Sequence, residues 1–161
     1  MNTDKELKYK ETSSKILEAF YKVYNVFGYG FLEKIYERAL MIELKKLGLK
    51  CKNQQAINVY YEEEVIGNYI ADIIVEDKIL LELKSIKSLS IQDECQILNY
   101  LSCTELEVGL LLNFGPKPQA KRKVFDNERK PYIRTIRAKQ QEKLYEEYHD
   151  EYSSRIHTDK H

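Results

Sequence analysis

Residues 69–84 have the sequence YIADIIVEDKILLELK, and this stretch decides the fold that we expect. Two apolar runs, 69–75 and 79–84, are rich in leucine and β-branched residues and are separated by a short charged segment. Apolar runs on either side of a polar turn are typical of a β-hairpin. The stretch therefore predicts two adjacent antiparallel strands with a turn centred near Asp77.

In that hairpin Asp72 and Glu82 lie directly opposite each other, with Cβ atoms about 5 Å apart. Lys84 follows Glu82 by two residues and therefore shares its face of the sheet. Two carboxylates and a lysine on an otherwise apolar sheet need an explanation, because burying unpaired charge is costly. A divalent metal ion supplies one; the alternative is a buried Asp–Lys–Glu ion pair without chemistry.

The chain of 161 residues suits one domain with an appendage, and its 43% hydrophobic and 32% charged residues are typical of a globular protein. No apolar run is long enough to span a membrane, and the N-terminus lacks the apolar core of a secretory signal. The cysteines Cys51, Cys95 and Cys103 are odd in number and lack ligand-like spacing. We therefore expect packing thiols in a cytoplasmic protein with no membrane partner.

The net charge of zero hides a basic block. Residues 117–139 hold nine Lys or Arg against two Asp or Glu, whereas residues 1–116 hold 14 against 18 and residues 140–161 hold three against six. A polyanion such as nucleic acid would bind the basic block. The alternative is a solvated edge strand whose lysines prevent aggregation.

Hydrophobic periodicity predicts an alternation of helices and strands. The predicted helices span 12–27, 31–47 and 91–102, and a polar helix spans 138–152. The predicted strands span 56–61, 69–75, 79–84, 107–112, 121–125 and 132–137. Ser90 begins a capping box for the third helix. Because that helix connects strand 79–84 to strand 107–112, these two strands are expected to run parallel.

The order helix, three strands, helix, strand, with Asp72 on the second strand and Glu82-Leu83-Lys84 on the third, resembles the PD-(D/E)XK nuclease superfamily. The segment GFLEKIY, residues 30–36, matches the signature of the bacterial GxxExxY family within it. Further segments similar to that family are ADIIVE (71–76), LELK (81–84), QILNYL (96–101) and GLLLNFG (109–115).

The resemblance implies an α/β fold of the restriction-endonuclease type, with an αβββαβ core and a mixed central sheet flanked by helices. It covers roughly residues 14–126. We therefore expect a nuclease domain over residues 1–128. Residues 129–161 would form an extension made of a strand and a polar helix that frays at its end.

The resemblance also implies metal-dependent hydrolysis of phosphodiester bonds in nucleic acid, in DNA rather than RNA. Asp72, Glu82 and the main-chain carbonyl of Leu83 would bind Mg²⁺, or Mn²⁺ in its place, because such ions prefer hard oxygen ligands. Glu33 would reach the metal from its helix, directly or through water. Lys84 would hold or activate the attacking water, as a base if burial lowers its pKa and otherwise as a fixed positive charge.

Substrate contacts are expected from two helices and from the basic block. Tyr36 lies one turn after Glu33 and would bind a phosphate or Glu33 itself. Gln96 and Tyr100 share one face of the third helix. They resemble the Gln-x-x-x-Tyr feature of some nucleases in the superfamily, which implies that they orient the substrate or Lys84. Purely structural roles are the alternative. Glu33 would then be a glutamate that stabilises the start of its helix, and Gln96 and Tyr100 would be a polar and an aromatic residue at the boundary between helix and sheet. The predicted phosphate contacts of the basic block are Lys121, Arg122 and Lys123.

Three hypotheses follow from the sequence. The first is a Mg²⁺-dependent nuclease. The second is a catalytically weak or inactive nucleic-acid-binding or adaptor protein on a nuclease fold, because a fold does not fix a function. The third is a subunit whose polar tail from Gln140 docks a partner, a second copy or another protein, with the nuclease active only in the complex.

Overall fold

The computed structural model describes residues 3–158, with side chains described for residues 9–156. The elements in chain order are α1 (Thr3–Phe27), α2 (Glu33–Lys46), β1 (Cys51–Tyr61), β2 (Glu64–Val75), β3 (Ile79–Lys84), α3 (Ile91–Ser102), β4 (Val108–Phe114), β5 (Pro118–Val124), the 3-10 helix η1 (Asn127–Arg129) and α4 (Pro131–Thr158).

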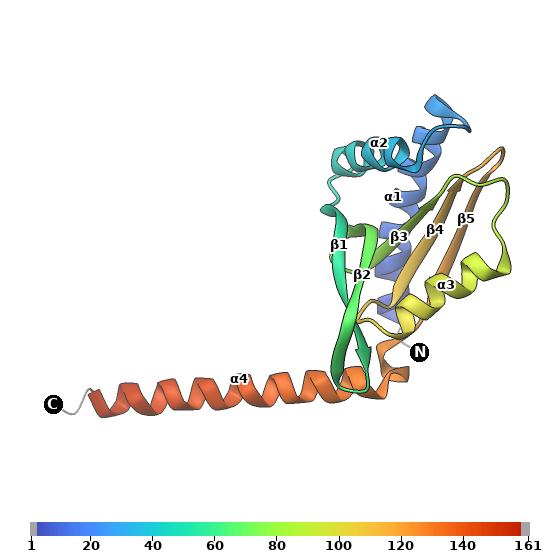
Figure 1. The fold of residues 1–161 in the computed structure, drawn as a ribbon. Helices are drawn as coiled ribbons and strands as arrows, with labels where there is room; N and C mark the ends of the chain where they lie inside the picture. The colour runs from blue at the N-terminus through green and yellow to red at the C-terminus, as the bar shows by residue number, and fades with distance from the viewer. Residues whose placement is uncertain (1–2, 159–161) are drawn as a thin grey trace.

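A mixed sheet of five strands, in the order β1-β2-β3-β4-β5, forms the centre of the molecule (Figure 1). The neighbours β3 and β4 are parallel, and the other neighbouring pairs are antiparallel. Helix α3 makes the crossover from β3 to β4, because parallel neighbours need a connection that returns along the sheet. The predicted α/β fold with a mixed sheet flanked by helices is confirmed.

Two apolar cores lie on opposite faces of the sheet. Leu81 belongs to the larger core together with Phe20 of α1, whereas its neighbour Leu80 belongs to the smaller core together with Ile97 of α3. This alternation follows from the period of two along a strand. Glu82 therefore falls on the α3 face of the sheet.

Two of the predicted helix ends are confirmed by their caps. Gly48 follows α2 with a φ of 77°, and its N–H donates to the carbonyl of Lys45 at 3.0 Å. Ser90 precedes α3: its Oγ accepts from the N–H of Asp93 at 3.2 Å, and Oδ2 of Asp93 accepts from the N–H of Ser90 at 2.8 Å. Helix α1, by contrast, begins at Thr3, well before the predicted start at residue 12.

The prediction of a strand over residues 132–137 is wrong, because this segment forms the first turns of α4. Pro131 at the first helical position fixes a φ suited to a helix. Ile133 is fully buried. The preceding Lys130 is also buried, and its Nζ donates to the carbonyls of Thr104 and Leu106 and to Oδ1 of Asn127 at 2.8–2.9 Å. This anchor sets the direction in which α4 leaves the domain.

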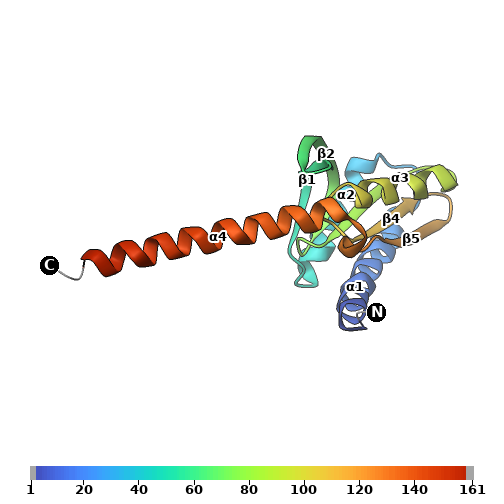
Figure 2. The same cartoon turned by 90° about the horizontal axis from the view of Figure 1, so that it is seen from below.

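Beyond its first turns, α4 projects away from the rest of the molecule in both views (Figures 1 and 2). Residues 137–156 are all exposed. Near its base, Lys139 forms a salt bridge with Glu63 in the β1–β2 turn. No helix within residues 3–158 is long and apolar enough to cross a membrane.

Candidate functional site

Asp72 lies where the hydrogen bonding between β2 and β3 stops. The strands pair in the predicted register, but pairing ends at Ile73 and Leu81, one position before Asp72 would face Glu82. The N–H of Leu83 donates instead to Oδ2 of Asp72 at 2.8 Å. The carboxylate of Asp72 thus takes the place of a main-chain acceptor at the point where the two strands separate.

The strand on the other side of Asp72 is also irregular. Gln54 is the β1 residue in register with Asp72, and its φ of 50° lies in the left-handed region that residues other than glycine rarely occupy. Its Nε2 donates to Oε1 of the buried Glu37 on α2 at 2.9 Å. The kink therefore turns β1 toward α2 and leaves space beside Asp72.

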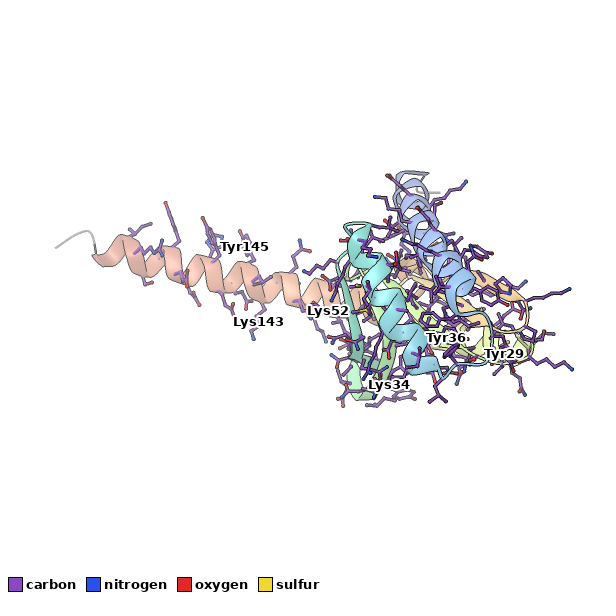
Figure 3. The ribbon with its side chains drawn as sticks, turned by 90° about the horizontal axis from the view of Figure 1, so that it is seen from above. Tyr29, Lys34, Tyr36, Lys52, Lys143 and Tyr145 are labelled. Carbon is purple, nitrogen blue, oxygen red and sulfur yellow. The ribbon has the colours of Figure 1, made fainter. Side chains whose placement is uncertain are left out.

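That space is a pocket of about 480 Å³ between α2 and the strands. Figure 3 marks one of its residues, Lys34, on α2. Carboxylates and cationic side chains both face the pocket, an arrangement that suits a phosphate held together with a cation. The lining residues are Glu33, Lys34, Glu37, Arg38, Asn53, Gln54, Asp72 and Leu83.

The environment of Glu82 disfavours a bare negative charge. Burial, followed by the neighbouring charge of Asp72, raises the pKa of Glu82 to about 7, although the Tyr69 hydroxyl and the charge of Lys84 act in the opposite direction. The Tyr69 hydroxyl donates to Oε1 of Glu82. A cation beside these two carboxylates would relieve their repulsion.

Glu33 joins this group from the first turn of α2. Its pKa is raised by burial and by the charge of Asp72, and lowered by the charge of Lys84 and by the N–H of Ser85. The structure therefore brings together side chains from α2, β2 and β3 that are far apart in the sequence.

Lys84 lies among carboxylates without forming a salt bridge to Asp72 or Glu82 in the described part of the chain. Its charge lowers the pKa of Glu33, Glu82 and Asp93. The alternative of a closed Asp–Lys–Glu ion pair is therefore not supported, and the ammonium group can serve another anion.

The expected contact of Tyr36 with substrate or with Glu33 is not seen. Tyr36 is fully buried, and Figure 3 marks it on α2. Its hydroxyl donates to the carbonyl of Gly28 at 2.5 Å and accepts from the N–H of Phe31 at 3.2 Å. Its ring stacks on Phe114 at 4.1 Å. Tyr36 thus fixes the loop before α2, because its side chain points inward and not toward the pocket.

Gln96 and Tyr100 do share one face of α3, and they reach Glu82 through a residue that the sequence did not single out. Nε2 of Gln96 donates to the Tyr100 hydroxyl at 3.1 Å. The Tyr100 ring stacks on Tyr69, with centroids 3.6 Å apart and planes 17° apart. Strand alternation alone would place Tyr69 and Asp72 on opposite faces. Ala71 and Ile74 pack in the same smaller core, however, so the alternation is broken between them, and both Tyr69 and Asp72 act on the pKa of Glu82.

The basic strand is split between two faces. Glu82 of β3 and Lys121 of β5 are both paired with Leu111 of β4. They therefore lie on the same face of the sheet, about 10 Å from each other. Lys123 lies on this face too, but it forms a 2.8 Å salt bridge with Glu94 of α3. Arg122 falls on the opposite face by alternation. Of the three predicted contacts, Lys121 is therefore the best placed.

A ready-made metal centre is not present in the described residues, since no three His, Cys, Asp or Glu side chains come close enough together to hold an ion. The site offers the carboxylate pair of Asp72 and Glu82 and the carbonyl of Leu83. This hard oxygen set fits Mg²⁺, which uses one or two carboxylates and keeps several waters.

Comparison with known proteins assigns the chain to a family. The family model of the PD-(D/E)XK nuclease superfamily matches residues 10–124, so the chain belongs to that superfamily. Nucleases of this superfamily generally use divalent metal ions. No curated protein matches the sequence.

Two solved structures are distantly similar to this chain. The alkaline exonuclease LHK-Exo from Laribacter hongkongensis is 13% identical, with 76% of this chain and 72% of the exonuclease covered and a TM-score of 0.37. The structure of SSO0001 is 20% identical, with 80% of this chain and 63% of SSO0001 covered and a TM-score of 0.45. Both likenesses are too distant to indicate the activity of this chain.

Proposed function

We propose that this protein hydrolyses phosphodiester bonds of DNA with Mg²⁺, for which Mn²⁺ can substitute, as a GxxExxY-type member of its superfamily. The proposal is supported above all by the opening of the sheet around Asp72, where Glu33, Glu82 and Lys84 come together. Glu33 and Glu82 both have raised pKa values, and perturbed pKa values are common at functional sites.

Asp72, Glu82 and the main-chain carbonyl of Leu83 would hold the metal ion, and Glu33 would contact it directly or through water. One oxygen of each inner carboxylate already has a partner: Oδ2 of Asp72 accepts from the N–H of Leu83, and Oε1 of Glu82 accepts from Tyr69. Glu82 also accepts from the main-chain N–H of Asp72, so a cation would share the remaining lone pairs of the two carboxylates. A divalent ion held by these residues would supply charge stabilisation for the phosphoryl group.

Lys84 would orient the attacking water or the scissile phosphate. Its ammonium group is close enough to Glu33 and Glu82 to lower the pKa of each. A positive charge held in this position stabilises a developing hydroxide or phosphoryl oxygen. Phosphates on either side of the scissile bond would meet Lys34 and Arg38 in the pocket and Lys121 on β5.

The test is cleavage of labelled single-stranded, duplex and branched DNA, with matched RNA, in Mg²⁺, Mn²⁺ and EDTA. We expect cleavage of DNA that requires the metal and is lost in Asp72→Asn and Lys84→Ala. Cleavage that persists in both variants, or in EDTA, would contradict the proposal.

The second candidate is a nucleic-acid-binding protein with weak or no chemistry, because the described residues lack a ready-made set of three metal-binding side chains. It predicts salt-sensitive DNA binding that is unchanged in Asp72→Asn, without cleavage. The cleavage panel above separates the two candidates.

We also propose that α4 mediates association, with a second copy of the chain or with another protein. Large apolar side chains recur at helical spacing along its exposed part: Leu144, Tyr145, Tyr148, Tyr152 and Ile156 are 43–67% exposed. Most of the stability of helices in proteins comes from the packing of an apolar face against other elements. Sedimentation velocity of the full chain and of a chain ending at residue 139 tests this role.

A further inference from the structure

We infer that Tyr69 is a positioning residue for Glu82, through which α3 fixes the carboxylate that faces the metal and the substrate. The inference rests on the proposed function and assigns to Tyr69 a part in it that neither the family match nor the sequence motifs contain.

The first step is the contact between Tyr69 and Glu82. The hydroxyl of Tyr69 donates to Oε1 of Glu82, and both side chains are partly buried. A glutamate has several rotamers, and a fixed donor on one oxygen reduces the number that Glu82 can adopt. Hydrogen bonds from a second layer of residues orient metal-binding carboxylates in this way.

The second step is the contact between Tyr69 and α3. The rings of Tyr69 and Tyr100 are stacked, with centroids 3.6 Å apart, and the Tyr100 hydroxyl accepts from Gln96. Stacked aromatic pairs resist displacement of either ring. The position of α3 therefore restrains the ring of Tyr69 and, through its hydroxyl, Glu82.

The third step is that α3 is itself held firmly. Ile97 and Leu101 are buried in the smaller core, the capping box at Ser90 closes the N-terminal end of α3, and Glu94 forms a salt bridge with Lys123 of β5. A helix fixed to the sheet at these points gives Tyr100, and hence Tyr69, a constant place. A ligand that moved α3 would also change the orientation of Glu82.

The test uses Tyr69→Phe, which keeps the ring and its stacking but removes the hydroxyl. The matched control is Tyr60→Phe, because Tyr60 lies on the neighbouring strand and its hydroxyl also donates to a glutamate, Glu105, at 3.5 Å. Both variants and the wild type are titrated with Mn²⁺ alone by calorimetry. Cleavage is then measured at saturating metal to separate kcat from KM, and melting temperatures report on packing.

For Tyr69→Phe we expect affinity for Mn²⁺, or kcat, to fall by about 10- to 100-fold, the usual cost of losing a residue that orients a metal ligand. KM for DNA and the melting temperature should stay near wild type, and Tyr60→Phe should behave as wild type throughout. Tyr100→Phe, which keeps the stack, should have a smaller effect than Tyr100→Ala, which removes it.

Unchanged Mn²⁺ affinity and kcat in Tyr69→Phe would overturn the role of Tyr69 and leave the proposed hydrolysis standing. Equal losses in Tyr69→Phe and Tyr60→Phe would also overturn it, because they would show a general effect of losing a tyrosine hydroxyl. A wild-type protein that neither binds Mn²⁺ nor cleaves DNA would overturn the proposed function itself, and the role of Tyr69 with it.

Discussion

The N–H of Leu83 donates to Oδ2 of Asp72 at 2.8 Å, at the place where the ladder between β2 and β3 has already ended. The bond gives the carboxylate of Asp72 a fixed direction before any ligand arrives. It also gives a hydrogen-bond acceptor to the main-chain N–H of Leu83, a residue that is only 2% exposed. The Asp72 side chain therefore supports the sheet and would also serve the proposed metal site, and the two roles can be separated by mutation.

Asp72→Asn should separate them. The amide oxygen can still accept from Leu83, so the melting temperature should stay close to wild type, whereas Mn²⁺ binding and cleavage should fall by at least about 100-fold because the charge is lost. Asp72→Ala leaves the N–H of Leu83 without its acceptor and should cost about 1–3 kcal/mol of stability as well. Calorimetric titration and urea unfolding measure the two effects; equal stability of both variants would show that the Leu83 bond contributes nothing.

The metal-free protein should become less stable as pH rises from about 4.5 to 7. The pKa of Glu82 is about 7 in the folded protein against an ordinary value of 4.5, because of burial and the charge of Asp72. Between these values the native state binds more protons than the unfolded chain, so the free energy of unfolding falls, by about 3 kcal/mol at most. Urea unfolding in EDTA measures this slope.

Glu82→Gln should flatten that part of the pH profile. Glu105→Gln, which changes an exposed glutamate that also accepts from a tyrosine, should leave it as in wild type. A profile that Glu82→Gln does not alter would mean that another group produces the slope.

Lys121 and Lys123 should differ as phosphate contacts. Lys121 lies on the row of Glu82, whereas Lys123 is already bound to Glu94. Lys121→Ala should weaken DNA binding and reduce the slope of log affinity against log salt by about 1. Lys123→Ala should change that slope less, because its charge is compensated in the free protein. Fluorescence anisotropy at several salt concentrations compares them, and identical slopes would argue against a role for the salt bridge.

Lys130→Met should destabilise the domain by about 3 kcal/mol, because three acceptors lose a buried charged donor. Lys143→Met, on the exposed part of α4, should have almost no effect. Urea unfolding followed by circular dichroism gives both values. A small loss in Lys130→Met would mean that apolar packing, for example at Ile133, anchors α4 without the lysine.

Patterns of local interactions made much of this protein predictable. The hairpin of residues 69–84, its register, the capping box at Ser90 and the parallel pairing through α3 depend on neighbouring residues and on the chirality of the chain. The prediction of a strand over residues 132–137 was wrong because the isoleucines and the threonine of this segment can be accommodated in a strand or in a helix. Pro131 and the buried Lys130 decide for the helix, and the anchor of Lys130 depends on carbonyls far away in the sequence.

The candidate site also contains residues that could be predicted from the sequence and residues that could not. The sequence by itself predicted a site at Asp72, Glu82, Lys84 and Glu33, because charged residues in apolar strands and a signature at a helix start are visible without coordinates. It could not show that Tyr36 turns inward or that Tyr69 reaches Glu82. Those outcomes depend on the interrupted pairing around Asp72 and on the packing of α2 and α3 against the sheet, which only the tertiary structure decides, because contacts between distant segments fix where each side chain points.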